Sequence, residues 1–158
     1  MRICVDTTIL LDVLKDEYRA FQEMLYAAIE KDEELSTPSV VYAELIPQFR
    51  GNVNFLQQFL REHKIDVHPL DIESVTIAAS AWMEYLKRKK RARCPQCGYE
   101  LERKEHLLSD FYIAGFALAK CDAILTRDRG IYRTYFPELK GYQGCLGSNL
   151  YSETRDSG

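Results

Sequence analysis

The sequence predicts an α/β protein with three layers, in which helices cover both faces of a central parallel sheet. Short apolar segments typical of buried strands alternate along the chain with longer segments that repeat apolar residues at helical spacing. This alternation favours parallel strands joined by helices. The chain has 158 residues, of which 46% are apolar, and a domain of that size can bury a core without cross-links.

Local sequence supports each element in turn. Apolar residues 3–5 form a short strand that ends in Asp6, and Thr7 and Thr8 can cap the helix that follows. Pro38 fits the first turn of a later helix, because its missing N–H group needs no partner there. The other strands are short apolar runs, and the helices each carry one apolar face. We expect these strands over residues 34–37, 65–70 and 123–125 and the helices over residues 18–30, 38–50, 55–63, 72–90, 107–118 and 129–136.

Residues 1–143 are expected to form a single domain. Its helical pattern breaks at about residues 87–106, where a basic run is followed by a Cys-x-x-Cys sequence. We expect this segment to project from the domain surface. Residues 144–158 are rich in Gly, Ser, Asn and Asp and are expected to form a flexible tail.

Charge and hydropathy exclude several classes of protein. With 24 acidic and 21 basic residues the net charge is −3, so the chain is not a uniformly basic nucleic-acid coat protein. No apolar run approaches the roughly 18 residues of a membrane span. Asp6 and Asp12 interrupt the apolar N-terminus, so we expect no signal peptide. We therefore expect a cytoplasmic protein with reduced thiols and no membrane partner.

Four acidic residues occupy positions where the predicted fold would bring them together. Asp6 and Asp128 follow two predicted strands, Asp110 begins a helix, and Glu44 lies on an otherwise apolar helix. Ligands of parallel sheets bind beyond the carboxyl ends of the strands, and carboxylates gathered there would repel one another. Mg²⁺ or Mn²⁺ would relieve that repulsion, because hard cations prefer oxygen ligands.

A structural role is the alternative for each of these acids. Asp6 and Asp110 could cap helices, Asp128 could belong to a turn, and Glu44 could face solvent. The spacing of the residues leaves both interpretations open.

Four motifs in order resemble the PIN domain, the PilT N-terminus family of metal-dependent ribonucleases, and in particular VapC-type toxins and their archaeal relatives. The resemblance extends from Arg2 to about Tyr142. Its most specific part is the sequence LTRDRGIY at residues 125–132. The other motifs are DTTILLD at 6–12, YAEL at 42–45 and SDFYIA at 109–114.

The resemblance implies a PIN-like fold and a site in which Asp6, Glu44, Asp110 and Asp128 hold Mg²⁺ or Mn²⁺. It also implies that the Thr126 hydroxyl positions a neighbouring carboxylate, which makes these five residues the expected catalytic set.

Three neighbouring positions are less well defined by the resemblance. Many relatives carry Asn or Ser at the position of Thr8, so the role of this threonine is open. We expect Asp12 and Asp122 to be solvated or to cap helices.

The implied reaction is hydrolysis of an RNA phosphodiester by metal-bound water. The resemblance also implies a homodimer and a small antitoxin partner that blocks the cleft, often with an arginine. The resemblance therefore favours a toxin ribonuclease. The alternatives are a PIN nuclease of RNA processing or maturation and a non-catalytic RNA-binding PIN module; the presence of all four acids disfavours the module.

The segment over residues 87–106 adds two further hypotheses. Cys94 and Cys97, followed by Gly98, resemble one knuckle of a zinc ribbon and supply half of a tetrahedral Zn²⁺ site. His106 or a second chain could supply further ligands, and free thiols or a reversible disulfide are the alternative. The basic run could contact RNA phosphates or form a solvated helix face. It consists of Lys87, Arg88, Lys89, Lys90, Arg91 and Arg93.

Overall fold

The computed structural model describes residues 1–89, 94–99 and 107–144. Its four strands form one parallel sheet in the order β3-β2-β1-β4. This arrangement confirms the predicted α/β class with a central parallel sheet. The strands are β1 (Arg2–Val5), β2 (Glu34–Pro38), β3 (Ile65–His68) and β4 (Ala123–Leu125).

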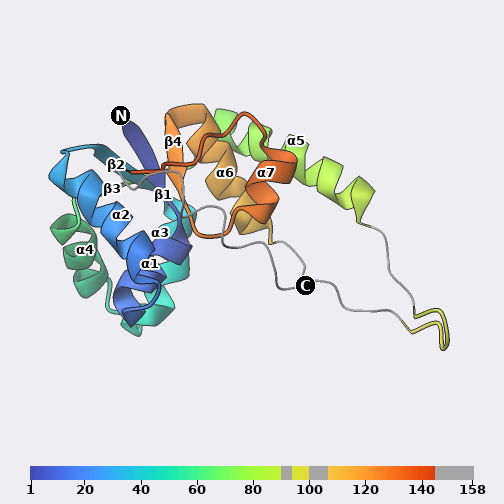
Figure 1. Ribbon diagram of the computed structural model, residues 1–158, viewed down its shortest axis with the longest axis horizontal. Coiled ribbons are helices and arrows are strands. Elements are labelled where there is room, and N and C mark those ends of the chain that lie inside the picture. The colour runs from blue at the N-terminus through green and yellow to red at the C-terminus, as the bar shows by residue number, and fades with distance from the viewer. Residues whose placement is uncertain (90–93, 100–106, 145–158) are drawn as a thin grey trace.

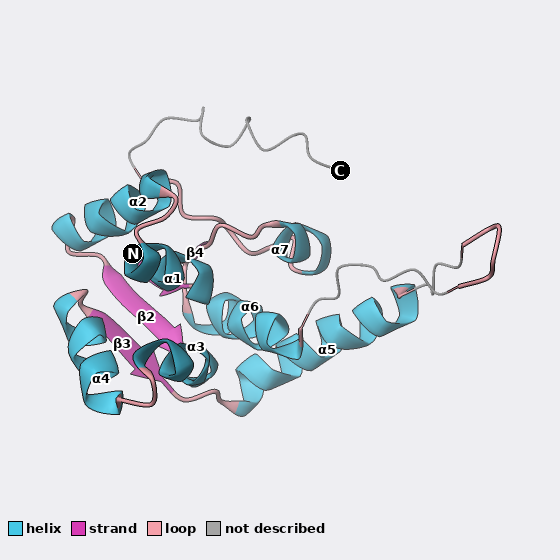
Figure 2. Cartoon of the chain, turned by 90° about the horizontal axis from the view of Figure 1, so that it is seen from below, coloured by secondary structure: helices cyan, strands magenta, loops and turns pink. Residues whose placement is uncertain are grey.

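Helices cover both sides of the sheet. Figure 1 shows α1 to α4 on one side of the strands and α5 and α6 on the other, with α7 beside α5 and α6. Helix α6 contacts β1, β2 and β4 and packs along the long helix α5 (Figure 2). The helices are α1 (Thr7–Lys15), α2 (Arg19–Glu30), α3 (Ser39–Leu45), the 3-10 helix η1 (Ile46–Phe49), α4 (Val53–Glu62), α5 (Ile72–Arg88), α6 (Leu108–Lys120) and α7 (Gly130–Tyr135).

The central strand β1 determines where the polar residues of the carboxyl edge lie. Its residues Ile3, Cys4 and Val5 are fully buried, as expected for a strand covered on both faces. Val5 pairs with Leu125 of β4, and the N–H of Asp6 donates to the carbonyl of Leu125 at 3.0 Å. The residues that follow β1 and β4 therefore leave the sheet side by side.

Helices α5, α6 and α7 are held together by close packing and by aromatic rings. Gly115 of α6 lies against α5, where a Cβ atom would come within 2.9 Å of the Ala78 Cβ. The ring of Phe111 lies 5.0 Å from that of Trp82 on α5 and 5.8 Å from that of Phe136, which follows α7. These contacts fix α6 and α7 relative to each other at the carboxyl edge of the sheet.

Several boundaries differ from the sequence-based expectation. The strand expected over residues 65–70 ends at His68, and the helix expected over residues 38–50 is divided into α3 and η1. Pro38 ends β2 in an extended conformation and precedes α3, so it does not lie in the first turn of the helix.

Helix α5 ends at Arg88, two residues before its expected end at residue 90. Lys87 and Arg88 lie in its last turn, where basic side chains interact favourably with the helix dipole.

Several predictions fall on residues outside the described ranges. They concern Lys90, Arg91 and Arg93 of the basic run, His106, Cys145 and the tail from residue 145 to residue 158. In the part of the chain that is described, no helix has both the length and the apolar character needed to cross a membrane.

Candidate active site

Asp6 lies at the end of β1, where it also begins α1. Its Oδ1 accepts the N–H of Thr7 at 2.7 Å, so the carboxylate caps the helix. Its Oδ2 accepts the hydroxyl of Thr126 at 2.6 Å and that of Thr8 at 3.1 Å. The residue is only 3% exposed. Residues that follow the neighbouring strands β1 and β4 thus hold the buried carboxylate of Asp6 in a fixed orientation.

Burial perturbs the ionisation of this carboxylate. The pKa of Asp6 is raised from 3.8 to about 6, chiefly by loss of solvent and in smaller part by the nearby charge of Asp110. The hydrogen bonds from Thr126, Thr8 and Thr7 lower the pKa and offset only part of the effect. The groups around Asp6 therefore leave the negative charge of its carboxylate undercompensated. A bound cation would stabilise this charge further.

The turn after β4 brings Asp128 next to Asp6. The N–H of Asp128 donates to the Thr126 hydroxyl oxygen at 3.1 Å, and the same hydroxyl donates to Asp6. The Oδ1 of Asp128 accepts the N–H of Gly130 at 3.3 Å, at the start of α7. Thr126 therefore links the two aspartates.

Asp110 approaches the same place from α6. It lies in the first turn of that helix, where its Oδ2 accepts the N–H of Leu107 at 3.2 Å. Burial raises the pKa of Tyr132 on α7 most, and the nearby charges of Asp6, Asp110, Cys4 and Asp128 raise it further. The three aspartates therefore all lie near this buried phenol.

Glu44 is joined to this group through the residue after Asp6. The hydroxyl of Thr7 donates to the Oε2 of Glu44, which is half-buried on α3. Hydrogen bonds therefore connect Asp6, Thr126 and Asp128 at the carboxyl edge, and Thr7 connects Glu44 to the same place. Asp110 lies near enough for its charge to raise the pKa of Asp6. Asp6 and Asp110 also cap α1 and α6, so the two interpretations left open by the spacing are compatible for these residues.

The side chains that could bind a metal at this site offer only oxygen ligands, and oxygen ligands suit Mg²⁺ or Mn²⁺. Within the described ranges, no three His, Cys, Asp or Glu side chains are close enough to form a ready-made metal cage. The undercompensated charge of Asp6 fits a cation all the same.

A second polar cluster, which the sequence did not reveal, fixes the same turn. The expectation that Asp12 is solvated or caps a helix is wrong: it is 1% exposed and accepts the Nε of Arg127 at 3.1 Å. The Arg127 guanidinium also lies 3.9 Å from the ring centroid of Tyr18, and its backbone N–H donates to the Thr8 hydroxyl at 3.3 Å. Arg127 stands between Thr126 and Asp128, so this cluster helps to position both.

The pairing of Asp12 with Arg127 could have been anticipated only from strand order. Each residue lies a short distance beyond one of two strands, β1 and β4, that turn out to be neighbours. Burial raises the pKa of Asp12, and the hydrogen bond and charge of Arg127 lower it in part. By contrast, Asp122 is exposed and accepts the N–H of Arg2 at 2.7 Å, in keeping with its expected role.

The Cys-x-x-Cys segment does not join the carboxylates. Figure 1 shows residues 94–99 far from the sheet. The described part of the basic run lies nearer. Lys87, Arg88 and Lys89 are exposed at the end of α5, and the Arg88 guanidinium lies 5.7 Å from the ring centroid of Tyr135 on α7.

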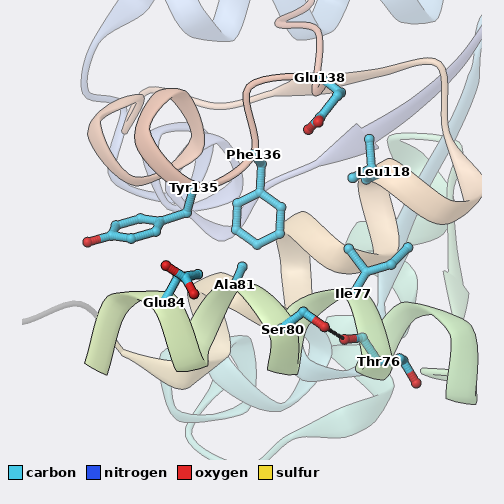
Figure 3. Close-up of a pocket in the computed structure, with 9 residues that line it drawn as sticks. All are labelled: Thr76, Ile77, Ser80, Ala81, Glu84, Leu118, Tyr135, Phe136 and Glu138. Atoms are coloured by element: carbon cyan, nitrogen blue, oxygen red, sulfur yellow. Dashed lines mark hydrogen bonds between the residues drawn. The ribbon is translucent and has the colours of Figure 1, made fainter. Parts of the chain in front are cut away.

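A hollow of about 390 Å³ lies between α5, α6 and α7. Figure 3 shows that Glu84 and Glu138 are its charged side chains, around an apolar floor that includes Ile77 and Phe136. Two carboxylates would repel a phosphate. The hollow is therefore a poor substrate site for a phosphodiester, and none of the four predicted acids lines it.

The fold and site define a class of α/β protein that presents oxygen ligands at the carboxyl edge of a parallel sheet. The family model of the PIN domain matches residues 3–137, and the chain therefore belongs to the PIN domain family, whose members are generally nucleases.

Among solved structures, the fold is similar to a chain of VapBC2 from Rickettsia felis, in the crystal structure of that complex bound to a DNA fragment from its promoter. The two chains share 16% identity with a TM-score of 0.63, and the match covers 89% of this chain and 96% of that chain. No curated protein matches the chain by sequence.

The raised pKa of Asp6 predicts an unusual effect of the Asp6→Asn substitution. Because the folded-state pKa of about 6 exceeds the ordinary value of 3.8, the folded state binds the proton more tightly than the unfolded state does. The contribution of Asp6 to the free energy of unfolding should therefore fall as the pH rises through this window, by up to about 3 kcal/mol. Asp6→Asn should remove this loss and be the more stable protein at pH 7.5 in the absence of divalent metal.

Urea unfolding at pH 4 and pH 7.5 measures this effect, and Asp66→Asn, at an exposed position on β3, is the matched control. Mn²⁺ should stabilise the wild type more than Asp6→Asn, since only the wild type offers the buried charge. A difference in stability between the wild type and Asp6→Asn that does not change between pH 4 and pH 7.5, or that grows in favour of the wild type as the pH rises, would contradict the assignment.

Replacing Arg127 tests whether its guanidinium compensates the buried charge of Asp12. Arg127→Met is expected to lower the free energy of unfolding at pH 7 by about 3 kcal/mol, because it leaves a buried carboxylate without its cation. The deficit should shrink at low pH, where Asp12 becomes protonated, and the double variant with Asp12→Asn should recover most of it. Arg61→Met, at an exposed position on α4, serves as control. Equal stabilities of Arg127→Met and Arg61→Met would show that Arg127 does not compensate Asp12.

Proposed function

We propose that the chain is a metal-dependent endoribonuclease that hydrolyses RNA phosphodiester bonds. The observation that carries this proposal is the buried, undercompensated carboxylate of Asp6. Thr126 links this carboxylate to Asp128, and the nearby charge of Asp110 raises its pKa further. Membership of a family that consists generally of nucleases supports the same conclusion.

The residues of the site would have different roles in the hydrolysis. Asp6, Glu44, Asp110 and Asp128 would hold Mg²⁺ or Mn²⁺, which supplies an activated water and neutralises charge on the phosphate when it is bound. The Thr126 hydroxyl orients the carboxylate of Asp6 and receives the N–H of Asp128. Thr126 acts as a positioning residue, because its hydrogen bonds hold Asp6 and Asp128 in place relative to each other.

RNA would reach this site along the basic end of α5. Helix α7 begins two residues after Asp128 and carries Tyr135, which lies under the guanidinium of Arg88. Lys87 and Lys89 flank Arg88 and are exposed. A polyanion bound at the carboxylates could therefore extend toward these cations, and binding to phosphates needs no base specificity.

We further propose that the nuclease is the toxin of a VapBC-type pair, with a small antitoxin protein as partner and a homodimer as the active form. The support is the similarity of the fold to a chain of VapBC2, a complex that binds DNA of its own promoter. A PIN nuclease of RNA processing would share the same site and would differ in its effect on the cell.

Cleavage of RNA by the purified chain tests the enzymatic proposal. Single-stranded RNA should be cut with Mg²⁺ or Mn²⁺ and should stay intact with EDTA. Asp6→Asn, Asp110→Asn and Asp128→Asn should each lower the rate by about 100-fold or more, because metal-derived stabilisation amounts to several kcal/mol. Thr126→Val should lower it by about 10- to 100-fold, with Thr126→Ser close to wild type.

Asp66→Asn is the matched control for these variants and should keep full activity. Cutting that persists in EDTA, or that survives Asp6→Asn, would overturn the proposed site.

Induced expression of the wild type, but not of Asp6→Asn, should arrest growth if the chain is a toxin. Active enzyme without growth arrest would instead identify an RNA-processing nuclease.

Salt dependence tests the path along α5. In the inactive Asp6→Asn background, the triple change of Lys87, Arg88 and Lys89 to Gln should make the plot of log binding constant against log salt concentration less steep. The slope should change by roughly 0.7 for each RNA phosphate that is no longer neutralised, and so by up to about 2. A matched triple change of the exposed residues Lys31, Arg61 and Lys64, which precede β2 and β3 in the chain and so lie toward the amino ends of the strands, should leave the slope unchanged. Equal slopes for the two triple variants would rule out binding of RNA to this end of α5.

A further inference from the structure

Residues 94–99 form a tight turn that brings two thiols together. The N–H of Cys94 donates to the carbonyl of Tyr99 at 2.8 Å, and the N–H of Gly98 donates to the carbonyl of Cys94 at 2.9 Å. Gly98 has a φ of +70°, a conformation that favours glycine. These two bonds close the turn, so that both cysteines lie on one short, self-supporting loop.

The loop stabilises a thiolate at Cys94. Its sulfur accepts the backbone N–H groups of Cys97 and Gln96 and the thiol of Cys97. The thiolate is the form of cysteine that binds metals. Backbone donors aimed at sulfur, together with a second cysteine three residues later, form half of the ligand set of a structural zinc site.

The described part of this chain does not supply the other half. No third His, Cys, Asp or Glu lies close enough to complete a site there. The other two described cysteines, Cys4 and Cys121, are hydrogen-bonded to each other beside the sheet. The loop itself lies away from the helices (Figure 1), and Cys97 is exposed. It is therefore placed to meet another protein chain.

We propose that Cys94 and Cys97 of two copies of this chain bind one Zn²⁺ ion in a four-cysteine site on a twofold axis. Structural zinc sites are tetrahedral and closed, and a twofold axis duplicates any pair of ligands. The site is separate from the carboxylates, and the inference does not depend on RNA cleavage.

Charge complementarity favours a second copy of the chain as the partner at this zinc site. Zn²⁺ with four thiolates carries a net charge of −2, and the exposed Lys87, Arg88 and Lys89 precede Cys94 closely in the chain. Because Cys94 is the fifth residue after Lys89, the two Cα atoms lie within roughly 18 Å of each other. The site offsets the repulsion between two basic segments and joins them into one positive surface.

The amount and spectrum of bound metal test the proposal on the full-length chain, kept reduced. Co²⁺ replaces Zn²⁺ as the probe, because its absorption distinguishes tetrahedral coordination by four thiolates from coordination by two. Titration should reach saturation at one Co²⁺ per two chains with the four-thiolate spectrum, and Zn²⁺ should displace it. Cys94→Ser with Cys97→Ser should abolish the signal, whereas Cys121→Ser should leave it unchanged.

Variants of residues outside the described ranges decide where the remaining ligands come from. Cys145→Ser and His106→Gln should leave both the spectrum and the ratio of one metal to two chains unchanged. One Co²⁺ per chain, a two-thiolate spectrum, loss of the signal in Cys145→Ser or His106→Gln, or no metal uptake would each overturn the shared site. Because cleavage is not the readout, failure here would leave the proposed ribonuclease untouched.

Discussion

The carboxylate of Asp6 is buried at the end of the central strand, and the protein does not fully compensate its charge. Three hydrogen bonds hold it in place, yet its pKa remains raised to about 6. The groups around it depend on this one position. Thr126 faces Asp6 because β1 and β4 are paired in register, and Asp128 follows because its N–H reaches the same threonine hydroxyl. A protein shaped for stability alone would place an apolar or neutral group there, and strain of this kind is expected at a functional site.

The sequence was informative wherever local chemistry determines structure. The apolar run before Asp6 and the alternation of strands and helices predicted the parallel sheet, because burial on both faces leaves a clear pattern in short strands. The buried pair of Asp12 and Arg127 could not be predicted in this way. It depends on β4 lying next to β1, an order that neither strand encodes alone. The hydrogen bond from Thr7 to Glu44 likewise joins α1 to α3, and helical spacing did not reveal it.

Helix capping and site formation use the same residues here. Asp6 and Asp110 each accept a backbone N–H at the start of a helix, where the helix dipole favours negative charge. Capping therefore orients the carboxylates toward the edge of the sheet, and aromatic packing of Phe111 against Trp82 and Phe136 keeps α6 in place. The polar turn at Arg127 does the same for the loop after β4. A rigid frame thus surrounds a small region in which negative charges are crowded, and that combination suits a cation and a phosphate better than it suits an apolar ligand.

The charge state of Asp6 is the quantity on which this account depends, and NMR titration of its labelled carboxyl carbon measures it directly. Without divalent metal, the apparent pKa of Asp6 should lie near 6 rather than at the ordinary value of 3.8. Added Mg²⁺ should lower this pKa, because a bound cation favours the ionised form. An Asp6 carboxyl that titrates near 3.8 without metal and does not respond to Mg²⁺ would contradict the account.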